Sequence, residues 1–362
     1  MTLHSELGKW AELEEELDGL GVPMALDHRA TWIREVEQAQ FQFAEFRNTH
    51  TGSLIAAIPI RANETRVMPG HFRMRIRHLG LQLPPPSAAQ VLGALSDWVE
   101  ESPRILGLSV EFLFLDQELR RHGERAAREA GFKPARSPRR YRHTPCLLLD
   151  ADEDELLASF GKSCRQSIRN PAKKGYEVGP LYDEALAPRM AELWKETFHR
   201  TGASPPARDW VAHLRFARKH PDLYRIIGTF GPGGTPQEGL QAFACAKHNG
   251  DHAVYSDGAS TRDAEPGVAL SYAPMWELIR WARGEGLHWF DMGGMTFDPT
   301  DPRQGISDFK RRFTDQVLEV GGEWELRSPS VRGKAADFLS GSASYFRHLL
   351  RRVTPPRLGL PS

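Results

Sequence analysis

The segment WFDMGGMTFDPTDPRQGISDFKRRF, residues 289–313, is the stretch from which the rest of the chain is best interpreted. Its aromatic start favours a β-strand, which ends at Asp291 and the glycine pair Gly293-Gly294. Glycine permits positive φ and lets another group approach the backbone closely. The segment therefore predicts a strand end at which a carboxylate lies beside an accessible turn.

A basic segment follows this strand end, after a loop rich in aspartate and proline. Phe309 and Phe313 are four residues apart, so one helical turn places both on one face and fixes Lys310 and its neighbours at the strand end. The simpler interpretation is a turn followed by a helix with a solvated basic face, since charge runs usually face solvent. The alternative is an anion or carbonyl site, in which a carboxylate, a glycine pair and cations gather at one strand end.

Length and composition describe a soluble globular chain with room for two domains. The 362 residues are 40% hydrophobic, and 47 basic residues balance 47 acidic ones, so the whole-chain charge indicates no particular partner. Three widely spaced cysteines without a CxxC argue against a disulfide framework or a zinc site, and we expect no metal. The chain has no signal-peptide core and no apolar run of about 20 residues, so we expect a cytoplasmic protein without a transmembrane segment.

The order of predicted elements repeats in two halves. Each half runs through helices, antiparallel strands, a helix, a strand, a helix and a strand. The first helix is predicted by apolar residues that recur at steps of three and four between positions 3 and 20. Hairpins combined with crossover helices indicate mixed layers. We predict an α/β (α+β) fold with two tandem domains, residues 1–150 and 151–327, each a mixed central sheet flanked by helices.

A basic tail, residues 328–362, follows these two domains. It carries six basic residues against one acid, with apolar residues at helical spacing. As part of a non-catalytic binding module, such a tail would lie on an acidic membrane surface or contact RNA. As part of an enzyme, it would dock as a helix on its own domain.

Five short motifs occur in order in the second half. They are RQSIRNPAKKGYEV (165–178), VYSDGAS (254–260), WARGEG (281–286), FDMGG (290–294) and GISDFKRRF (305–313). Together they resemble the Fem family of non-ribosomal aminoacyltransferases, which build peptidoglycan bridges and are grouped with the GNAT superfamily. The resemblance covers roughly residues 148–323.

The resemblance implies two GNAT-like acyltransferase domains and transfer of an aminoacyl group from aminoacyl-tRNA to an amine. Aminoacyl-tRNA would be a co-substrate rather than a cofactor. The acceptor would be an amine of a cell-wall precursor or of a peptide natural product. The acceptor could be linked to a nucleotide.

The competing donor is a coenzyme A thioester, whose pyrophosphate would lie on a glycine-rich turn at a helix N-terminus. The segment AEPGVA, residues 264–269, has the glycine and alanine of that pattern but lacks its Gln or Arg. Glu265 in the same turn would repel a phosphate. We therefore predict aminoacyl-tRNA as the donor, with coenzyme A as the alternative.

Aminolysis of an activated ester requires a neutral amine, a proton acceptor and a donor for the oxyanion. Lys310 is predicted to be that donor or a phosphate ligand, partly exposed and with its ammonium directed toward the strand end. Asp291 is predicted to accept the proton or to orient the amine. Its alternative role is structural, as a carboxylate that binds the amides of the next turn.

Further side chains are predicted to bind substrate. The basic segment would bind phosphates of tRNA or of a nucleotide-linked acceptor, unless it is a solvated helix face. Tyr255 and Asp257 are expected where a strand meets the acceptor channel, with a core tyrosine as the alternative. The predicted substrate-binding residues are Arg165, Arg169, Lys173, Lys174, Tyr255, Asp257, Gly293, Gly294, Phe309 and Arg312.

Overall fold

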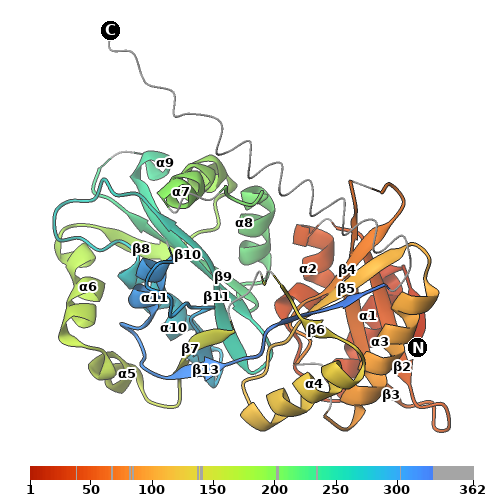
Figure 1. Ribbon diagram of the computed structural model, residues 1–362. Coiled ribbons are helices and arrows are strands. Elements are labelled where there is room, and N and C mark those ends of the chain that lie inside the picture. Colours follow the sequence, from red (N-terminus) through yellow and green to blue (C-terminus); the bar gives the residue numbers. More distant parts are fainter. Residues whose placement is uncertain are drawn as a thin grey trace.

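The computed structural model describes residues 1–328 apart from 38, 67, 81, 82, 84, 137, 139–141, 201–203, 234 and 302. The predicted basic tail lies outside the described residues beyond Ser328. Two mixed seven-stranded sheets lie side by side, each with helices on both faces (Figure 1). This architecture confirms the predicted α/β fold of two sheets flanked by helices.

The first sheet has the order β1-β2-β3-β4-β5-β14-β6, and β4 and β5 form its one parallel pair. Its strands are β1 (Thr2–His4), β2 (Phe41–Arg47), β3 (Leu54–Glu64), β4 (Phe72–Ile76), β5 (Ile105–Glu111), β6 (Lys133–Pro134) and β14 (Glu323–Arg327). The start of the chain differs from the sequence-based expectation, because residues 2–4 pair with β2 instead of opening the first helix.

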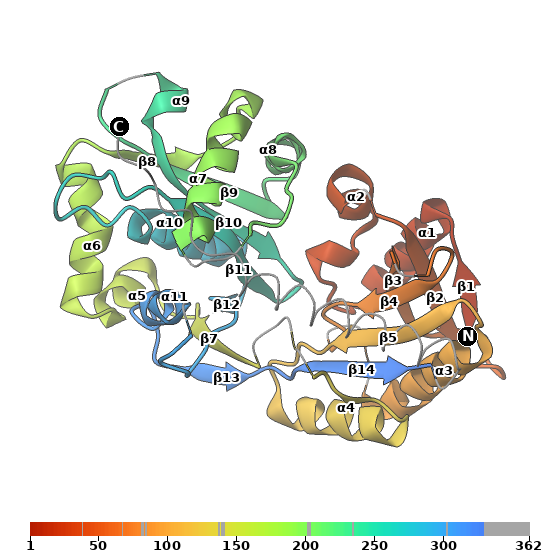
Figure 2. The ribbon, with the colours of Figure 1, turned by 45° about the horizontal axis from the view of Figure 1, so that its top comes forward.

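Helices cover both faces of the first sheet (Figure 2). One face carries α1 (Leu7–Gly19), η1 (Leu26–His28), α2 (Ala30–Trp32) and η2 (Ile33–Glu37); the other carries η3 (Pro85–Ser87), α3 (Ala88–Glu101) and α4 (Gln117–Glu129). Helix α1 forms because Trp10, Leu13 and Leu17 recur at steps of three and four, so they bury one stripe against the sheet.

The second sheet has the order β13-β7-β12-β11-β10-β9-β8, and β11 and β12 form its one parallel pair. Its strands are β7 (His143–Leu148), β8 (Glu177–Pro180), β9 (Tyr224–Phe230), β10 (Leu240–His248), β11 (His252–Ser260), β12 (Trp289–Asp291) and β13 (Val317–Glu319). The core on one face includes residues of α5 (Glu153–Ser159), α6 (Lys162–Lys173) and α10 (Tyr272–Gly284), with α11 (Gln304–Lys310) beside it. The core on the other face includes residues of η4 (Glu184–Leu186), α7 (Ala187–Arg200) and α8 (Trp210–Lys219), while α9 (Pro236–Gly239) lies between β9 and β10.

The two sheets exchange one strand each. Strand β7 precedes residue 150 but pairs with β12 and β13, whereas β14 belongs to the second half but pairs with β5 and β6. Figure 2 shows β13 and β14 following one another as the chain passes from one sheet to the other. The predicted division at residue 150 therefore does not coincide with sheet membership, because strand partners are chosen by long-range pairing rather than by local sequence.

Side chains from the first half also enter the second domain. The Trp32 ring lies 5.0 Å from that of Phe216 and 5.1 Å from that of Tyr224, centroid to centroid. The Lys247 ammonium lies 4.3 Å from the Trp32 ring centroid and forms an ion pair with buried Asp27. These contacts, which combine apolar burial with a desolvated charge pair, fix the two domains against each other.

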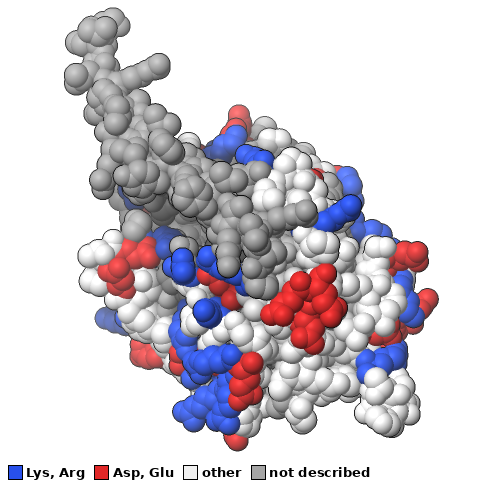
Figure 3. Space-filling view, turned by 45° about the vertical axis from the view of Figure 1, so that its right-hand side comes forward, with Lys and Arg blue, Asp and Glu red and all other residues white. Residues whose placement is uncertain are grey.

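Surface charge and helix hydropathy are two further properties of the described residues that bear on partners. On the face shown in Figure 3, basic and acidic side chains occur in small interspersed groups. No helix among the described residues is long and apolar enough to cross a membrane.

The exchanged strand leads to a stability prediction. Trp324 of β14 is 1% exposed and packs into the core of the first domain. We expect Trp324→Ala to lower the free energy of unfolding by about 3–5 kcal/mol, because it leaves a large cavity. Hydrogen exchange should show reduced protection of the amides of β5 (Ile105–Glu111), although that strand lies far from Trp324 in the sequence.

Leu148→Ala in β7 is the matched control, since that strand residue is 40% exposed. It should change stability by less than about 1 kcal/mol. Unaltered protection of the β5 amides in Trp324→Ala would contradict the strand exchange.

Candidate active site

An opening lies between the two parallel strands of the second sheet. Strands β11 and β12 pair only from His252 to Val254, because β12 ends at Asp291 while β11 continues to Ser260. The edge of β11 beyond Val254 therefore has no strand partner on that side among the described residues. An unpaired strand edge presents N–H and C=O groups that an extended ligand can bind.

The corresponding place in the first sheet is closed. Strands β4 and β5 stay paired to Ile76, and the amide of Leu79 still donates to the carbonyl of Glu111 at 3.0 Å. Gly80 packs so tightly that a Cβ there would lie 2.1 Å from the carbonyl oxygen of Leu113. An opening between the two parallel strands thus occurs in the second domain alone, as far as the described residues show.

Lys310 lies at the end of β12. Its ammonium donates to the carbonyl of Gly293 at 2.9 Å and to that of Gly294 at 2.8 Å, and it lies 5.8 Å from the centroid of the Tyr255 ring. The side chain is 6% exposed, so the expectation of a partly exposed lysine is wrong. Because the side chain is buried and donates to two carbonyls, its ammonium is a fixed positive charge that stabilises the turn at the glycine pair.

Asp291 holds the same turn from its other end. The carboxylate is 1% exposed, and its Oδ1 accepts from the amide of Gly293 at 2.6 Å and from the hydroxyl of Thr144. Its Oδ2 is buried and has no hydrogen-bond donor among the described residues. The structural role weighed for this carboxylate is therefore present at one oxygen, while the other oxygen accepts no hydrogen bond from a described residue.

A pocket of about 400 Å³ adjoins this turn, along the unpaired edge of β11 and beside the start of α10. Tyr255 and Phe309 line it, and Arg200 lies at its wall, donating to the carbonyl of Ser260 at 2.7 Å. Burial, with smaller contributions from Cys245 and Asp257, raises the pKa of Tyr255, so its hydroxyl stays protonated. The pocket is lined by aromatic, aliphatic, small and hydroxyl side chains and by one guanidinium.

Gly258 determines where Tyr255 lies. A Cβ on Gly258 would be 2.1 Å from the tyrosine hydroxyl oxygen, so the ring occupies the space that any other residue would fill. On the far side of the ring, Gly293 has a φ of 75° and a Cβ there would lie 3.0 Å from the carbonyl oxygen of Tyr255. The absence of a Cβ at Gly258 and Gly293 therefore allows Tyr255 and Lys310 to pack against the turn at the end of β12.

Asp257 lies on the other side of the sheet. A register shift next to Cys245 turns it away from Tyr255, and its Oδ1 accepts from Arg208 at 3.1 Å. Burial raises the pKa of Asp257, but the charges of Arg208 and Lys247 outweigh it and hold that pKa below its usual value. The expectation that Tyr255 and Asp257 line one channel is wrong, because the bulge breaks the strand alternation.

The basic segment forms α6, and its cations differ in their surroundings. Arg165 donates to the carbonyls of Ala158 and Phe160, so its guanidinium caps the end of α5. Lys174 donates to the carbonyl of Pro266 at 2.9 Å. The exposed cations of α6 that make no ion pair with another described residue are Lys162, Arg169 and Lys173, and the last two lie one helical turn apart.

The two phenylalanines pack as the spacing predicted. Phe309 and Phe313 meet edge to face at 5.4 Å, and Phe309 also meets Tyr272 at 5.0 Å. Arg312 is exposed. Burial raises the pKa of the Cys164 thiol in α6 to about 11, and the charges of Arg312 and Arg165 oppose that rise. These contacts join α11 to α6 and α10 around the pocket.

Sequence reasoning missed several groups at the site. Thr144, whose hydroxyl donates to Asp291, is 147 positions away and belongs to the exchanged strand, so no local signal marks it. Gly258 lies within a quoted motif, but its role follows only from the packing of Tyr255. No group of His, Cys, Asp and Glu in the described part of the chain is arranged to hold a metal ion.

Residues 162–311 match the family model described as Acetyltransferase (GNAT) domain. This match lies within the second domain and includes the opening between β11 and β12. No curated protein matches the sequence.

Solved structures share the two-domain fold of this chain. FemX is 15% identical with a TM-score of 0.70, over 90% of this chain and 97% of that one. L-PGS from Bacillus licheniformis is 13% identical with a TM-score of 0.54, over 88% and 92%. The C-terminal domain of a putative lysylphosphatidylglycerol synthetase from Agrobacterium fabrum is 12% identical with a TM-score of 0.50, over 92% and 96%.

The position of Lys310 leads to a second stability prediction. Lys310→Met keeps the aliphatic bulk but removes the charged donor from the carbonyls of Gly293 and Gly294. We expect the free energy of unfolding to fall by about 1.5–3 kcal/mol, measured by urea denaturation. Lys195→Met on the exposed face of α7 is the control and should be nearly neutral; equal stability of the two variants would show that Lys310 is not held as described.

The contact between Gly258 and Tyr255 can be tested separately. Gly258→Ala should force the ring away from Lys310, since the added methyl takes the position of the hydroxyl. With fluorotyrosine incorporated, the ¹⁹F resonance that Tyr255→Phe removes should shift.

Gly179→Ala in β8 is the matched glycine control, because a Cβ there meets nothing within 4 Å. It should leave that resonance in place. An unmoved resonance in Gly258→Ala would refute the proposed packing.

Proposed function

We propose that this chain forms an amide bond by transferring an aminoacyl group from aminoacyl-tRNA to the amine of a cell-wall precursor or of a peptide natural product. The observation that carries the proposal is the opening between β11 and β12, which has the buried Lys310 ammonium at its inner end. The match of residues 162–311 to a GNAT acetyltransferase domain supports the N-acyltransferase class.

The chemistry is aminolysis of an ester. The neutral amine attacks the ester carbonyl carbon, a C–N bond forms, and the C–O bond to the ribose breaks. The proton lost by nitrogen passes to the departing ribose oxygen, so an amide and a free hydroxyl result. This route requires a fixed positive charge near the carbonyl oxygen and a group that carries the proton.

Lys310 and Asp291 are suited to these two tasks. The lysine supplies positive charge in a site from which water is excluded, where one such donor commonly contributes about 3 kcal/mol to transition-state stabilisation. The buried Oδ2 of Asp291, which has no donor among the described residues, would take the proton from the amine and pass it on. The edge of β11 and the pocket beside α10 would hold the donor in register.

Two observations favour aminoacyl-tRNA as the donor. The turn before α10 carries Glu265, and Pro274 in the first turn of α10 removes one backbone N–H, so this helix start is poorly suited to a pyrophosphate. Helix α6 has no acidic residue and presents Arg169 and Lys173 to solvent, as an RNA backbone requires. One of the similar structures is named as a putative lysylphosphatidylglycerol synthetase, which is also consistent with aminoacyl transfer.

The second candidate is transfer from a coenzyme A thioester. The observation in its favour is the family model itself, whose description is an acetyltransferase. The two donors differ in size and charge, so the two candidate functions predict different effects on donor binding when the exposed cations of α6 are substituted.

Salt dependence of tRNA binding tests the proposal. We expect purified protein to bind aminoacyl-tRNA, and Arg169→Glu combined with Lys173→Glu to weaken that binding. Each lost phosphate contact should reduce the slope of log K against log salt by about 0.7–0.9, so the pair should reduce it by about 1.5. Filter binding at several salt concentrations measures the slope.

Helix α4 offers a matched control, because Arg121 and Arg125 are also exposed and one turn apart. Reversing both charges there should leave the slope unchanged. Saturable binding of acetyl coenzyme A, together with a tRNA slope that neither pair alters, would replace the first candidate by the second.

A further inference from the structure

The pocket beside α10 obtains its charge from a single helix end. Arg200, the last residue of α7, is the one charged side chain among the described residues that line this pocket. Helix α7 packs on one face of the second sheet, whereas α10 and α11 lie at the other face. The pocket therefore passes the free edge of β11 with a cation on one side and the aromatic rings of α10 and α11 on the other.

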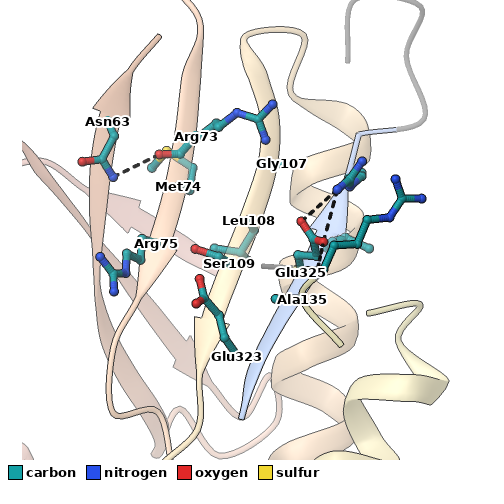
Figure 4. A pocket seen from close by; sticks show the side chains of 13 residues that line it. Asn63, Arg73, Met74, Arg75, Gly107, Leu108, Ser109, Ala135, Glu323 and Glu325 are labelled. Carbon is teal, nitrogen blue, oxygen red and sulfur yellow. Dashed lines mark hydrogen bonds and ion pairs between the residues drawn. The ribbon is translucent and has the colours of Figure 1, made fainter. Parts of the chain in front are cut away.

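The pocket of about 510 Å³ on β4, β5 and β14 of the first domain has a different lining. Figure 4 shows Arg73 and Arg75 on one side of β5 and Glu325 on the other. Charges of both signs meet there, because Arg75 contacts Glu111 and Arg327 contacts Glu325 at 3.2 Å. Charges in that pocket thus find partners within the protein, whereas the described lining of the pocket beside α10 contains a cation and no carboxylate.

The guanidinium of Arg200 is held in place without being neutralised. It donates to the carbonyl of Ser260 at 2.7 Å and to the hydroxyl of Thr197 at 3.0 Å, and it makes no ion pair with a described residue. A guanidinium has five N–H donors, so these two bonds leave donors available for a ligand. The two contacts fix the group at the end of β11, which prepares it to bind an anion.

A second guanidinium adds positive charge at this end of the pocket. Arg262, just after β11, is exposed and makes no ion pair with a described residue. Burial and the charge of Arg262 lower the pKa of Arg200, and together they outweigh the opposite effect of Glu196, which is itself 3.6 Å from Arg189. The two guanidinium groups repel each other, and an anion bound near both would offset that repulsion.

Arg200 and Lys310 lie at opposite ends of the same strand edge. Tyr255, whose ring centroid is 5.8 Å from the Lys310 ammonium, and Ser260, whose carbonyl binds Arg200, both line the pocket. Along a strand their Cα atoms are about 16 Å apart. A ligand that fills the pocket with its reacting carbonyl near Lys310 would therefore place a different group, remote from the reacting bond, at Arg200.

Both candidate donors carry a phosphate in this relation to the carbonyl. In aminoacyl-tRNA the ester is joined through the terminal ribose to the phosphates at the end of the RNA chain. In a coenzyme A thioester the carbonyl is joined through pantetheine to a pyrophosphate. The start of α10 is poorly suited to either group, because Glu265 precedes it and Pro274 lacks a backbone N–H.

We propose that Arg200, together with Arg262, binds a phosphate of the acyl donor at the Ser260 end of the pocket and so holds the donor carbonyl at the Lys310 end. The phosphate contact is thus made by the end of α7 instead of the start of α10. The assignment of the anion to the acyl donor rests on the proposed function, whereas the anion site itself does not.

Matched probes with and without charged phosphates test the proposal by calorimetry. One pair is an RNA duplex with a single-stranded CCA end, with either natural or uncharged methylphosphonate linkages between its last nucleotides. The other pair is coenzyme A and pantetheine. We expect the charged member of one pair to bind about tenfold more tightly than its uncharged partner, and Arg200→Gln to abolish that difference without changing binding of the uncharged member.

Two further variants grade the effect. Arg200→Lys should retain part of the difference, since the charge stays while the fork of donors is lost. Arg262→Gln should reduce the difference by a smaller factor, about two- to fivefold, because its guanidinium is exposed. Retained binding of the uncharged member shows that each variant is folded.

Arg283→Gln is the matched control. Arg283 is also an exposed arginine in the last turn of a helix, and it donates to a backbone carbonyl, that of Ala151, at 2.8 Å. It does not line the pocket, so this variant should bind all four probes as the unaltered protein does.

An unaltered preference for the charged probe in Arg200→Gln, or no preference for either charged probe, would overturn the phosphate site. This site and the proposed donor fail separately. A preference that occurs with coenzyme A alone and depends on Arg200 supports the site and refutes the tRNA donor. Aminoacyl transfer from tRNA with a phosphate preference that Arg200→Gln leaves intact refutes the site alone.

Discussion

Backbone pairing between β14 and β5, and between β7 and β12, is the constraint on which both domains depend. Each sheet contains a strand that the other half of the chain supplies, so neither sheet is complete without the other. The candidate active site inherits this dependence, because β12 lies between β7 and β11 and Asp291 receives a hydrogen bond from Thr144 of β7. Cooperative folding of the whole chain follows from this arrangement.

The charges buried between the domains strengthen the same coupling. Burial raises the pKa of Asp27, yet the charges of Arg77 and Lys247 outweigh it and keep the carboxylate ionised. A buried charge that lost its partner would be costly, so these residues favour a single arrangement of the two domains.

Local patterns in the sequence were sufficient for the parts of the site formed by neighbouring residues. The spacing of Phe309 and Phe313 placed Lys310 against the glycine pair, since one helical turn fixes that geometry. Its burial was underestimated, because water is excluded by aromatics from several elements. Features set by distant pairing could not be read from the sequence: the exchanged strands, the contact of Thr144, and the bulge that separates Asp257 from Tyr255.

The strand exchange also has a consequence for synthesis on the ribosome. The β5 edge that β14 covers is made at residue 111, and β14 begins at residue 323, a separation of 323 − 111 = 212 positions. At about 5–20 residues per second, this interval lasts on the order of 10–40 s. During that time the nascent first sheet exposes an unpaired edge, the feature by which strands of different chains associate. Because β14 is synthesised late, the growing chain would benefit from a chaperone that covers the β5 edge until β14 pairs with it.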